Sequence, residues 1–296
     1  MNKKVKKLFR DPKIFFKDMY LKRSIQLKKH IPIKRNGNHI FTVVSAVYNV
    51  EKYLNDYFDS LTTQSLDFKK HIRVILVDDG STDTSAQIIQ KWQKKYPKNI
   101  RYIYKENGGQ ASARNLGLKY VETDWVVFTD PDDYLHPDYF KSVDYLLYKT
   151  PSAMMLVTNI KLFLENQNIT KDSHPLKFRF DKTKNLKISA LDKFINLSVA
   201  STFFKNKHIK DKGLLFDDKL KPNFEDGKFI ADYLLDLQDS DAIFSREAVY
   251  FYRKREDSSS TLDTSWKKRE KFSNVFELGF IPMLQAYKDK LGYVPA

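Results

Sequence analysis

Near the middle of the chain the sequence reads Trp125-Val126-Val127-Phe128-Thr129-Asp130-Pro131-Asp132-Asp133. The apolar run at its start, bounded by polar turn residues, predicts a buried strand of an α/β sheet. Three carboxylates therefore gather where that strand ends, which is the edge at which open α/β sheets bind their ligands. Because Asp and Pro are also common turn residues, a purely structural turn is the alternative interpretation.

Packed carboxylates repel one another unless a cation or hydrogen-bond donors offset their charge. Hard oxygen ligands of this kind suit Mg²⁺ or Mn²⁺, which such sites commonly share with a substrate phosphate. The loop after residue 129 is therefore a candidate metal site, and a purely structural turn is its alternative.

The chain around this loop alternates between strand and helix patterns. Apolar runs predict strands at residues 41–45, 72–77, 100–104 and 125–129, and helical spacing predicts helices at 50–63, 84–95 and 111–120. Such alternation predicts an α/β fold with a mostly parallel central sheet, right-handed crossovers and helices on both faces.

The pattern is less regular after Asp133. The sequence predicts strands at residues 153–157, 242–244 and 249–252, helices at 192–199 and after Asn223, and a loop-rich stretch at 165–188.

Composition favours a globular protein of 296 residues, because 42% of them are hydrophobic and 14% are aromatic. The absence of cysteine excludes disulfides and thiolate metal sites, and the six histidines form no helical pair that would suggest zinc. No apolar run is long enough to span a bilayer, and the amino terminus has no secretory signal pattern. These features predict a cytoplasmic protein.

The net charge of +15 is concentrated at the amino terminus. Residues 1–35 hold 13 Lys or Arg against Asp11 and Asp18, a net +11, which leaves +4 for the rest of the chain. Val5, Leu8 and Phe9 share helical spacing, and Asp11-Pro12 is a plausible start for a second helix whose apolar face includes residues 14–20.

This basic arm, residues 1–38, has two interpretations. Apolar and aromatic residues opposite lysines suit a helix on an anionic membrane surface, whereas the same pattern suits a helix docked on its own domain or on a partner. Nucleic acid is disfavoured as a partner because the charge does not continue into the following domain. We expect that domain at 39–262, and at 263–296 a helical extension or the start of a further module.

Two further motifs follow the second and third predicted strands. Val77-Asp78-Asp79-Gly80-Ser81-Thr82-Asp83 places two carboxylates at a strand end, where one could accept from a uracil imide or a ribose hydroxyl. Asn107-Gly108-Gly109-Gln110-Ala111-Ser112-Ala113-Arg114-Asn115 places paired glycines before a helix whose free N–H groups suit an anion. Taken singly, each is also explained by a glycine turn with polar capping residues.

Together and in this order, these segments resemble the family 2 glycosyltransferases with a GT-A fold. The resemblance begins at Thr42-Val43-Val44-Ser45-Ala46-Val47-Tyr48-Asn49, runs through the motifs above and Asp130-x-Asp132-Asp133, and extends to Phe224-Glu225-Asp226. The chain is similar in particular to bacterial glycosyltransferases that build capsule and teichoic-acid-type surface polysaccharides. The resemblance covers residues 41–140 closely and 220–260 more loosely.

The resemblance implies a nucleotide-sugar site formed by eight residues: Tyr48, Asn49, Asp78, Asp79, Asn107, Gly109, Arg114 and Asp130. It implies that Tyr48 and Asn49 form the nucleotide pocket and that the Asp78-Asp79 pair holds the base.

Beyond the base, the resemblance implies that Arg114 approaches the nucleotide and that Asp130 lies near the ribose. It also implies that Asp132 binds a Mn²⁺ or Mg²⁺ ion bridging the two phosphates, and that Asp226 is the general base. The alternative for Asp226 is a helix N-terminal carboxylate that the helix dipole stabilises.

The segment Val249-Tyr250-Phe251-Tyr252-Arg253-Lys254-Arg255 precedes Ser258-Ser259-Ser260-Thr261. Similar segments lie near the donor phosphates in relatives that build surface polymers, so Arg253 or Arg255 could clamp the diphosphate. Some relatives carry a histidine metal ligand here, which this stretch lacks, and the second protein ligand of the metal stays open. A solvated charged loop is the alternative.

The resemblance implies an inverting, metal-dependent glycosyltransferase, and the basic arm would hold it at the inner face of the cell membrane. Its donor would be a UDP-sugar, and its acceptor a glycan or polyol-phosphate polymer. A nucleotidyltransferase shares the sheet and the metal, but it usually has a Gly-rich basic loop after the first strand, where this chain has Ala46-Val47-Tyr48-Asn49-Val50. An inactive sugar-nucleotide-binding module of a larger polymerase is the third possibility.

Overall fold

The computed structural model describes residues 38–174, 177–190, 198–220, 224–255, 277, 279 and 281–292. The chain divides into two compact units, Met1–Asn36 and Gly37–Ala296. The first unit, with the two helices expected in the basic arm, lies outside the described residues. So do Ser258–Thr261 and most of the helix expected at 192–199.

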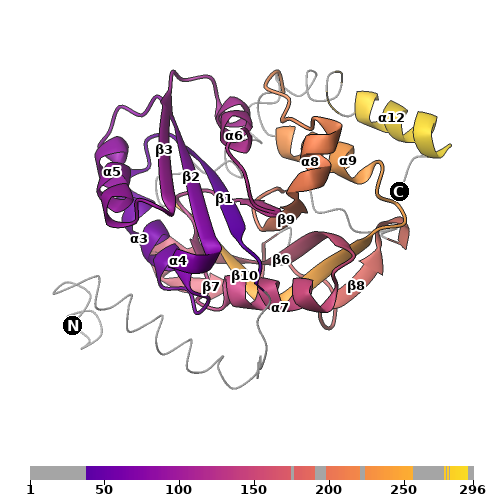
Figure 1. Ribbon diagram of the computed structural model, residues 1–296, viewed down its shortest axis with the longest axis horizontal. Coiled ribbons are helices and arrows are strands. Elements are labelled where there is room, and N and C mark those ends of the chain that lie inside the picture. The colour runs from indigo at the N-terminus through magenta and orange to yellow at the C-terminus, as the bar shows by residue number, and fades with distance from the viewer. Residues whose placement is uncertain are drawn as a thin grey trace. The chain divides into compact units, whose positions relative to one another are not determined.

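The first half of the second unit is a parallel α/β layer. Apart from the short helix α4, which the sequence did not predict, its elements follow the predicted alternation: β1 (Phe41–Val47), α3 (Glu51–Thr62), α4 (Phe68–His71), β2 (Ile72–Asp79), α5 (Ser85–Lys95), β3 (Ile100–Lys105), α6 (Gln110–Leu118) and β4 (Trp125–Phe128). The strands lie in the order β3-β2-β1-β4, and each neighbouring pair is parallel (Figure 1). All four carboxyl ends therefore meet at one edge of the sheet.

The second half widens the sheet and makes it mixed. It contains β5 (Tyr134–Leu135), α7 (Tyr139–Lys149), β6 (Ala153–Leu164), η1 (Glu165–Gln167), β7 (Ile169–Lys171), β8 (Lys184–Lys187), η2 (Ile188–Ala190), β9 (Thr202–Lys205), α8 (Asn206–Lys212), α9 (Glu225–Leu234), β10 (Asp241–Lys254) and α12 (Ile281–Leu291). The order continues β4-β9-β6-β10-β5, with β9 antiparallel to both its neighbours and β6 parallel to β10. The α/β class is confirmed, but antiparallel pairing beyond β4 is more extensive than the sequence predicted.

Several elements of this half differ from the sequence prediction. The stretch 165–188 contains the short strands β7 and β8, which pair with β6 and β10. The two late strands are one strand, β10, whose pairing with β6 shifts register between Phe244 and Val249. The polar residues Ser245, Arg246 and Glu247 at this irregularity interrupt the apolar pattern, which explains why the sequence predicted two strands.

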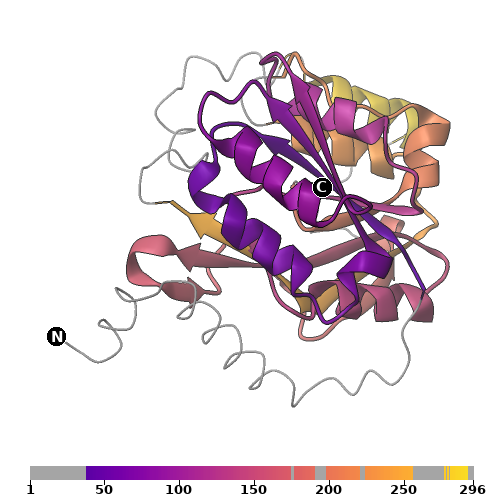
Figure 2. The ribbon, with the colours of Figure 1, turned by 60° about the vertical axis from the view of Figure 1, so that its left-hand side comes forward.

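Helices cover both faces of the sheet, as predicted. Helices α3, α5 and α7 pack on one face, and α6, α8 and α9 pack on the other. In Figure 2 the violet helices lie in front of the sheet, and the orange and yellow helices lie behind it. Helix α6 lies close to β1, because a Cβ on Gly117 would come 2.5 Å from Val44 Cγ1. Among the described residues, no helix is long and apolar enough to cross a membrane.

Candidate active site

The candidate site lies where the parallel strands end. Tyr48 follows β1, the Asp78-Asp79 pair ends β2, and the glycine loop 107–109 follows β3 and leads into α6. The loop 130–133 follows β4. The register of the sheet places Val47 opposite Asp78, and Asp78 opposite Tyr104. The fold thus brings the separate sequence motifs to one edge.

Both carboxylates of the aspartate pair hold neighbouring loops. Asp78 is fully buried and accepts from the Ser81 backbone N–H at 2.8 Å and from the Tyr102 hydroxyl at 2.8 Å. The hydrogen bond to Asp78 and burial raise the pKa of the Tyr102 hydroxyl, with burial the larger cause. Because Asp78 accepts from the turn after β2 and from β3 at once, it fixes this turn against the neighbouring strand.

Asp79 organises the glycine loop in the same way. It accepts from the backbone N–H groups of Gly108 at 2.9 Å and Gly109 at 2.8 Å, and pairs with Lys105. The Asn107 amide donates to the backbone carbonyl of Asp79 at 2.9 Å. Gly109 has φ +94°, a conformation that favours glycine, and caps α6. The structure therefore joins Asn107 and Gly109 to the aspartate pair.

Asn49 joins the end of β1 to the turn after β2. Its side-chain oxygen accepts from the Thr82 N–H at 2.8 Å, and its own N–H donates to Ser81 Oγ at 3.1 Å. Beside it, the Tyr48 side chain is 53% exposed, and Tyr104 on β3 is 60% exposed. Exposed aromatic rings beside a strand edge are suited to stacking on a planar base. Tyr104 was not singled out from the sequence, since only the sheet register brings it to this edge.

Arg114 links two parts of the site that are far apart in the sequence. It is 3% exposed on α6. Its Nη1 donates to Asp226 Oδ1 at 2.5 Å, and its Nη2 donates to Asp130 Oδ1 at 3.2 Å. Burial opposes its charged form, but Asp226, Asp130 and Glu225 together raise the pKa of the Arg114 guanidinium. Arg114 therefore stays charged and connects the loop after β4 to the start of α9.

Asp226 lies in the first turn of α9, where its second oxygen accepts from the Val199 N–H at 3.2 Å. Burial raises the pKa of Asp226 to about 6. Arg114 lowers this pKa, while Glu225 and Asp130 raise it further. A carboxylate with its pKa near neutrality is suited to accept a proton from a substrate.

The loop after β4 is held in place by contacts with β10. Asp133 is buried and accepts from the Tyr250 hydroxyl and the Arg253 N–H, both at 2.7 Å. Burial, with repulsion from Asp132 and Asp130, raises the pKa of Asp133 well above its usual range. The Asp130 N–H in turn donates to the Tyr250 hydroxyl at 3.1 Å. Tyr250, which the sequence analysis did not single out, thus holds both ends of this loop.

The two candidate arginines, Arg253 in β10 and Arg255 just after it, have different roles in the structure. Arg253 is 4% exposed, and its Nε donates to the Asp132 carbonyl at 2.7 Å. Its Nη2 pairs with Asp56 at 3.2 Å, and its Nη1 lies 3.6 Å from Glu165. Arg255 Nε and Nη2 both donate to Asp132 Oδ2, at 2.7 and 2.6 Å. Both side chains therefore contact Asp132, but Arg253 binds its backbone carbonyl, whereas Arg255 binds the carboxylate that is the candidate metal ligand.

The residues of this loop fit a divalent cation shared with a diphosphate. Burial raises the pKa of Asp132, and Asp130 adds to the effect while Arg255 opposes it, so additional positive charge would be favourable here. Among the described residues no group of three or more His, Cys, Asp or Glu could hold a metal alone. A single carboxylate that completes its coordination with substrate phosphates is a common arrangement for Mg²⁺.

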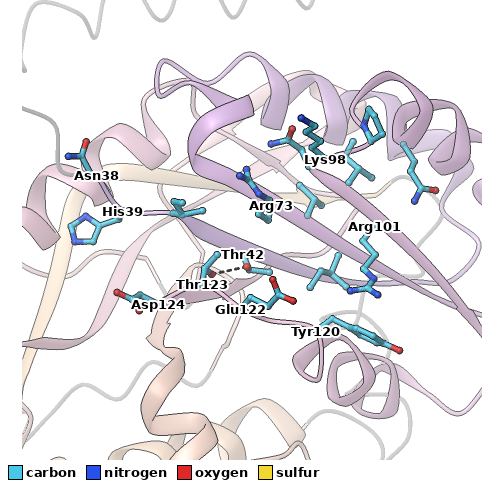
Figure 3. Close-up of a pocket in the computed structure, with 17 residues that line it drawn as sticks. Asn38, His39, Thr42, Arg73, Lys98, Arg101, Tyr120, Glu122, Thr123 and Asp124 are labelled. Atoms are coloured by element: carbon cyan, nitrogen blue, oxygen red, sulfur yellow. Dashed lines mark hydrogen bonds between the residues drawn. The ribbon is translucent and has the colours of Figure 1, made fainter.

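A separate cavity of about 750 Å³ opens at the opposite, amino-terminal ends of the parallel strands. Its lining includes Arg73 at the start of β2, Lys98 and Arg101 on either side of the start of β3, and Glu122 before β4 (Figure 3). The residues of the candidate site lie at the other end of the same strands.

Comparison with known protein families identifies the family of this chain. The model of glycosyl transferase family 2 matches residues 42–210, more than half of the chain. The chain belongs to this family. The match covers Tyr48 through Asp132 and ends before Asp226, Arg253 and Arg255.

Curated relatives match a longer part of this glycosyltransferase chain. The minor teichoic acid biosynthesis protein GgaB of Bacillus subtilis is 32% identical over 87% of the chain, and GgaA of the same organism is 31% identical over 83%. The poly(ribitol-phosphate) beta-N-acetylglucosaminyltransferase TarS of Staphylococcus aureus is 27% identical over 85%. The chain spans 28%, 54% and 42% of the lengths of these three proteins.

Solved structures confirm the GT-A fold. The crystal structure of S. aureus TarS 1–349 in complex with UDP-GlcNAc matches with a TM-score of 0.62, at 24% identity, over 85% of this chain and 71% of that one. The same fragment in complex with UDP matches with a TM-score of 0.61 at 23% identity. The expected α/β fold of the GT-A type is therefore confirmed.

Proposed function

We propose that residues 39–262 form the catalytic domain of an inverting, metal-dependent glycosyltransferase. It moves a sugar from a UDP-sugar to a hydroxyl group of a bacterial surface polysaccharide. The Arg114 bridge between Asp130 and Asp226 carries this proposal. Both carboxylates contact the one buried guanidinium, and burial raises the pKa of the second, Asp226.

The chemistry follows from this arrangement. The acceptor oxygen bonds to the anomeric carbon as the bond from that carbon to the diphosphate oxygen breaks, and the diphosphate leaves with the electron pair. Asp226 accepts the proton of the acceptor hydroxyl. One direct displacement inverts the anomeric centre. Arg114 favours the ionised form of Asp226 and so keeps the base ready.

The remaining residues bind the donor in this proposal. Tyr48 stacks on the base, and Asn49 with the Asp78-Asp79 pair forms the pocket around it. Asn107 and Gly109 bring backbone close to the nucleotide, and Asp130 lies near the ribose. A Mn²⁺ or Mg²⁺ ion held by Asp132 would offset the charge of the departing diphosphate.

Arg253 and Arg255 have different roles in this proposal. Arg255 contacts the Asp132 carboxylate and also binds the diphosphate, whereas Arg253 holds the loop 130–133 in place through the Asp132 carbonyl. The positive charge that offsets the departing diphosphate would thus come from the Arg255 side chain as well as from a metal ion.

The donor and acceptor classes are inferred from relatives. TarS is named for β-N-acetylglucosaminyl transfer to poly(ribitol-phosphate), and GgaB for teichoic acid biosynthesis. A polyol-phosphate polymer or related glycan is therefore the acceptor class that we propose. The basic arm at 1–38 would hold the enzyme at the anionic inner face of the membrane through its net charge of +11.

The proposal is tested by incubating the whole chain with a panel of UDP-sugars and a polyol-phosphate acceptor, with and without Mn²⁺, and measuring UDP release and product. We expect turnover with one or a few donors and its loss in EDTA. Calorimetric UDP binding without turnover would identify an inactive binding module. Release of pyrophosphate in a parallel incubation with UTP and a sugar 1-phosphate would instead identify a nucleotidyltransferase.

A further inference from the structure

Helix α12 lies beyond the part of the chain that matches the family model, yet it packs on the helix that carries Asp226 (Figure 1). We propose that Gly279, Met283 and Tyr287 are positioning residues for Asp226. Helix α12 and the residues just before it would thus set the position of the turn that carries this carboxylate. This inference rests on the role proposed for Asp226 above.

The first observation concerns Phe224, which immediately precedes Glu225-Asp226. A Cβ on Gly279 would lie 2.6 Å from Phe224 Cδ1, and a Cβ on Gly227 would lie 3.1 Å from Phe224 Cε2. The Phe224 ring is 8% exposed and shares a small apolar cluster with Leu220 and Met283. The ring is therefore held between the backbone before α12 and the backbone of α9, with no room for a methyl group on the α12 side.

Phe224 controls how α9 begins. It is the residue that caps the helix, and its carbonyl accepts from the Lys228 N–H at 3.0 Å in the first turn. Asp226 lies in the same turn and bonds to Arg114 and to the Val199 N–H. A shift of the Phe224 ring would consequently move the turn that carries both Asp226 contacts.

A second observation joins the two helices further along. The Tyr287 hydroxyl donates to the Ala231 carbonyl at 2.9 Å, and the Tyr287 side chain is 8% exposed. Asp236, just after α9, pairs with Lys290 of α12 and with Lys212 of α8. A buried hydrogen bond and a shared ion pair therefore fix α12 against α9, so that Gly279 and Met283 stay beside Phe224.

The test compares Gly279→Ala with the double variant Gly279→Ala/Phe224→Leu, in which the smaller side chain makes room for the added methyl group. Because misplacement of a catalytic group by about 1 Å can cost about 100-fold in rate, we expect Gly279→Ala to lower kcat by at least about tenfold. The donor KM and the UDP affinity should hold, because the aspartate pair and the glycine loop are held by contacts with each other and with β3 and the turn after β2, none of which involves α9 or α12. The double variant should recover most of the lost kcat. Tyr287→Phe, a milder change that removes only one hydroxyl, should lower kcat by a few fold.

The matched control is Leu284→Ala on the exposed side of the same helix, where the side chain is 36% exposed. It should leave kcat unchanged. Hydrogen–deuterium exchange of residues 225–231 gives a readout that needs no turnover: exchange in the first turn of α9 should rise in Gly279→Ala and fall back in the double variant. Unchanged exchange, or equal losses of kcat and UDP affinity, would overturn the inference. Absence of turnover in the unmodified chain would instead refute the proposed function. The exchange measurement would still decide whether α12 positions the first turn of α9.

Discussion

Arg114 Nη1 lies 2.5 Å from Asp226 Oδ1, although 111 residues separate the two along the chain. The guanidinium is buried, and it also contacts Asp130. An ion pair between a buried arginine and a partly exposed carboxylate keeps that carboxylate in a fixed direction while one side of it stays open to a substrate. This relationship is the basis for assigning proton transfer to Asp226 and donor contact to Asp130.

Replacing Asp226 with Asn should abolish most transfer but spare donor binding. The amide keeps the shape of the side chain and cannot accept a proton, and positioned bases contribute about 10² to 10⁴-fold. Steady-state turnover and UDP calorimetry on the same preparation check both parts. A carboxylate that only stabilises the helix N-terminus would be replaced by Asn with little loss. Near-normal transfer would therefore remove Asp226 from the mechanism and leave Glu225 as the next candidate.

The rate of transfer should depend on pH through Asp226. Its pKa is raised to about 6, and the base must be ionised to act, so kcat should be high above this pH and fall as the pH drops through about 6. The sign for stability is opposite: a carboxyl group whose folded pKa exceeds its unfolded value of about 3.9 stabilises the fold when protonated, and this contribution is lost as pH rises between the two values. A pH–rate profile with its inflection near 4 would contradict the assignment.

Removing the carboxylate of Asp132 should eliminate the metal dependence of donor binding. Asp132→Ala takes away the proposed protein ligand and removes the contact of Arg255 with its carboxylate. We expect calorimetry with UDP to give the same weak affinity with and without Mn²⁺. Asp130→Asn is the matched control, and it should weaken donor binding less because it keeps a hydrogen-bonding group of the same size. Unchanged Mn²⁺-dependent affinity in Asp132→Ala would exclude Asp132 as the ligand.

Substitutions of Arg253 and Arg255 should have separate effects on stability and on donor binding. Arg253→Met removes a buried charge that faces Asp56 and Glu165. Breaking a fully buried pair typically costs about 3 to 5 kcal/mol, and because both carboxylates are partly exposed the loss should lie below that range. Arg255→Met removes a more exposed partner of Asp132 and should mainly weaken UDP binding. Thermal unfolding and UDP calorimetry on both variants check this division. A large drop in Tm for Arg255→Met with normal UDP binding would reverse the two roles.

Deleting residues 1–36 should leave the second compact unit folded and reduce its binding to anionic vesicles. Each basic residue near an anionic surface contributes about 1 kcal/mol, and residues 1–35 carry a net +11. Sedimentation with phosphatidylserine vesicles at two salt concentrations measures the effect, with neutral vesicles as the control. If the truncated protein sediments as well as the full chain does, the arm is not the anchor.

The early motifs could be predicted from sequence because they are local. An apolar run that ends in Asp130-Pro131-Asp132-Asp133 specifies a strand and the loop after it, and parallel order then brings such loops to one edge. The β10 strand shows the limit of this reasoning. Its polar residues 245–247 interrupt the apolar pattern, and only pairing with β6 makes one strand of it.

By itself, the sequence determined which side chains stand at the strand ends, since strand period and turn chemistry act over a few residues. Tertiary structure alone decided which of them meet. Arg114 reaches Asp226, Arg255 reaches Asp132, and Phe224 lies beside Gly279. Each contact joins segments more than 50 residues apart. The physical reason is that burial and ion pairing act through space, so the partner of a buried charge is set by how the layers pack and not by its neighbours in the chain.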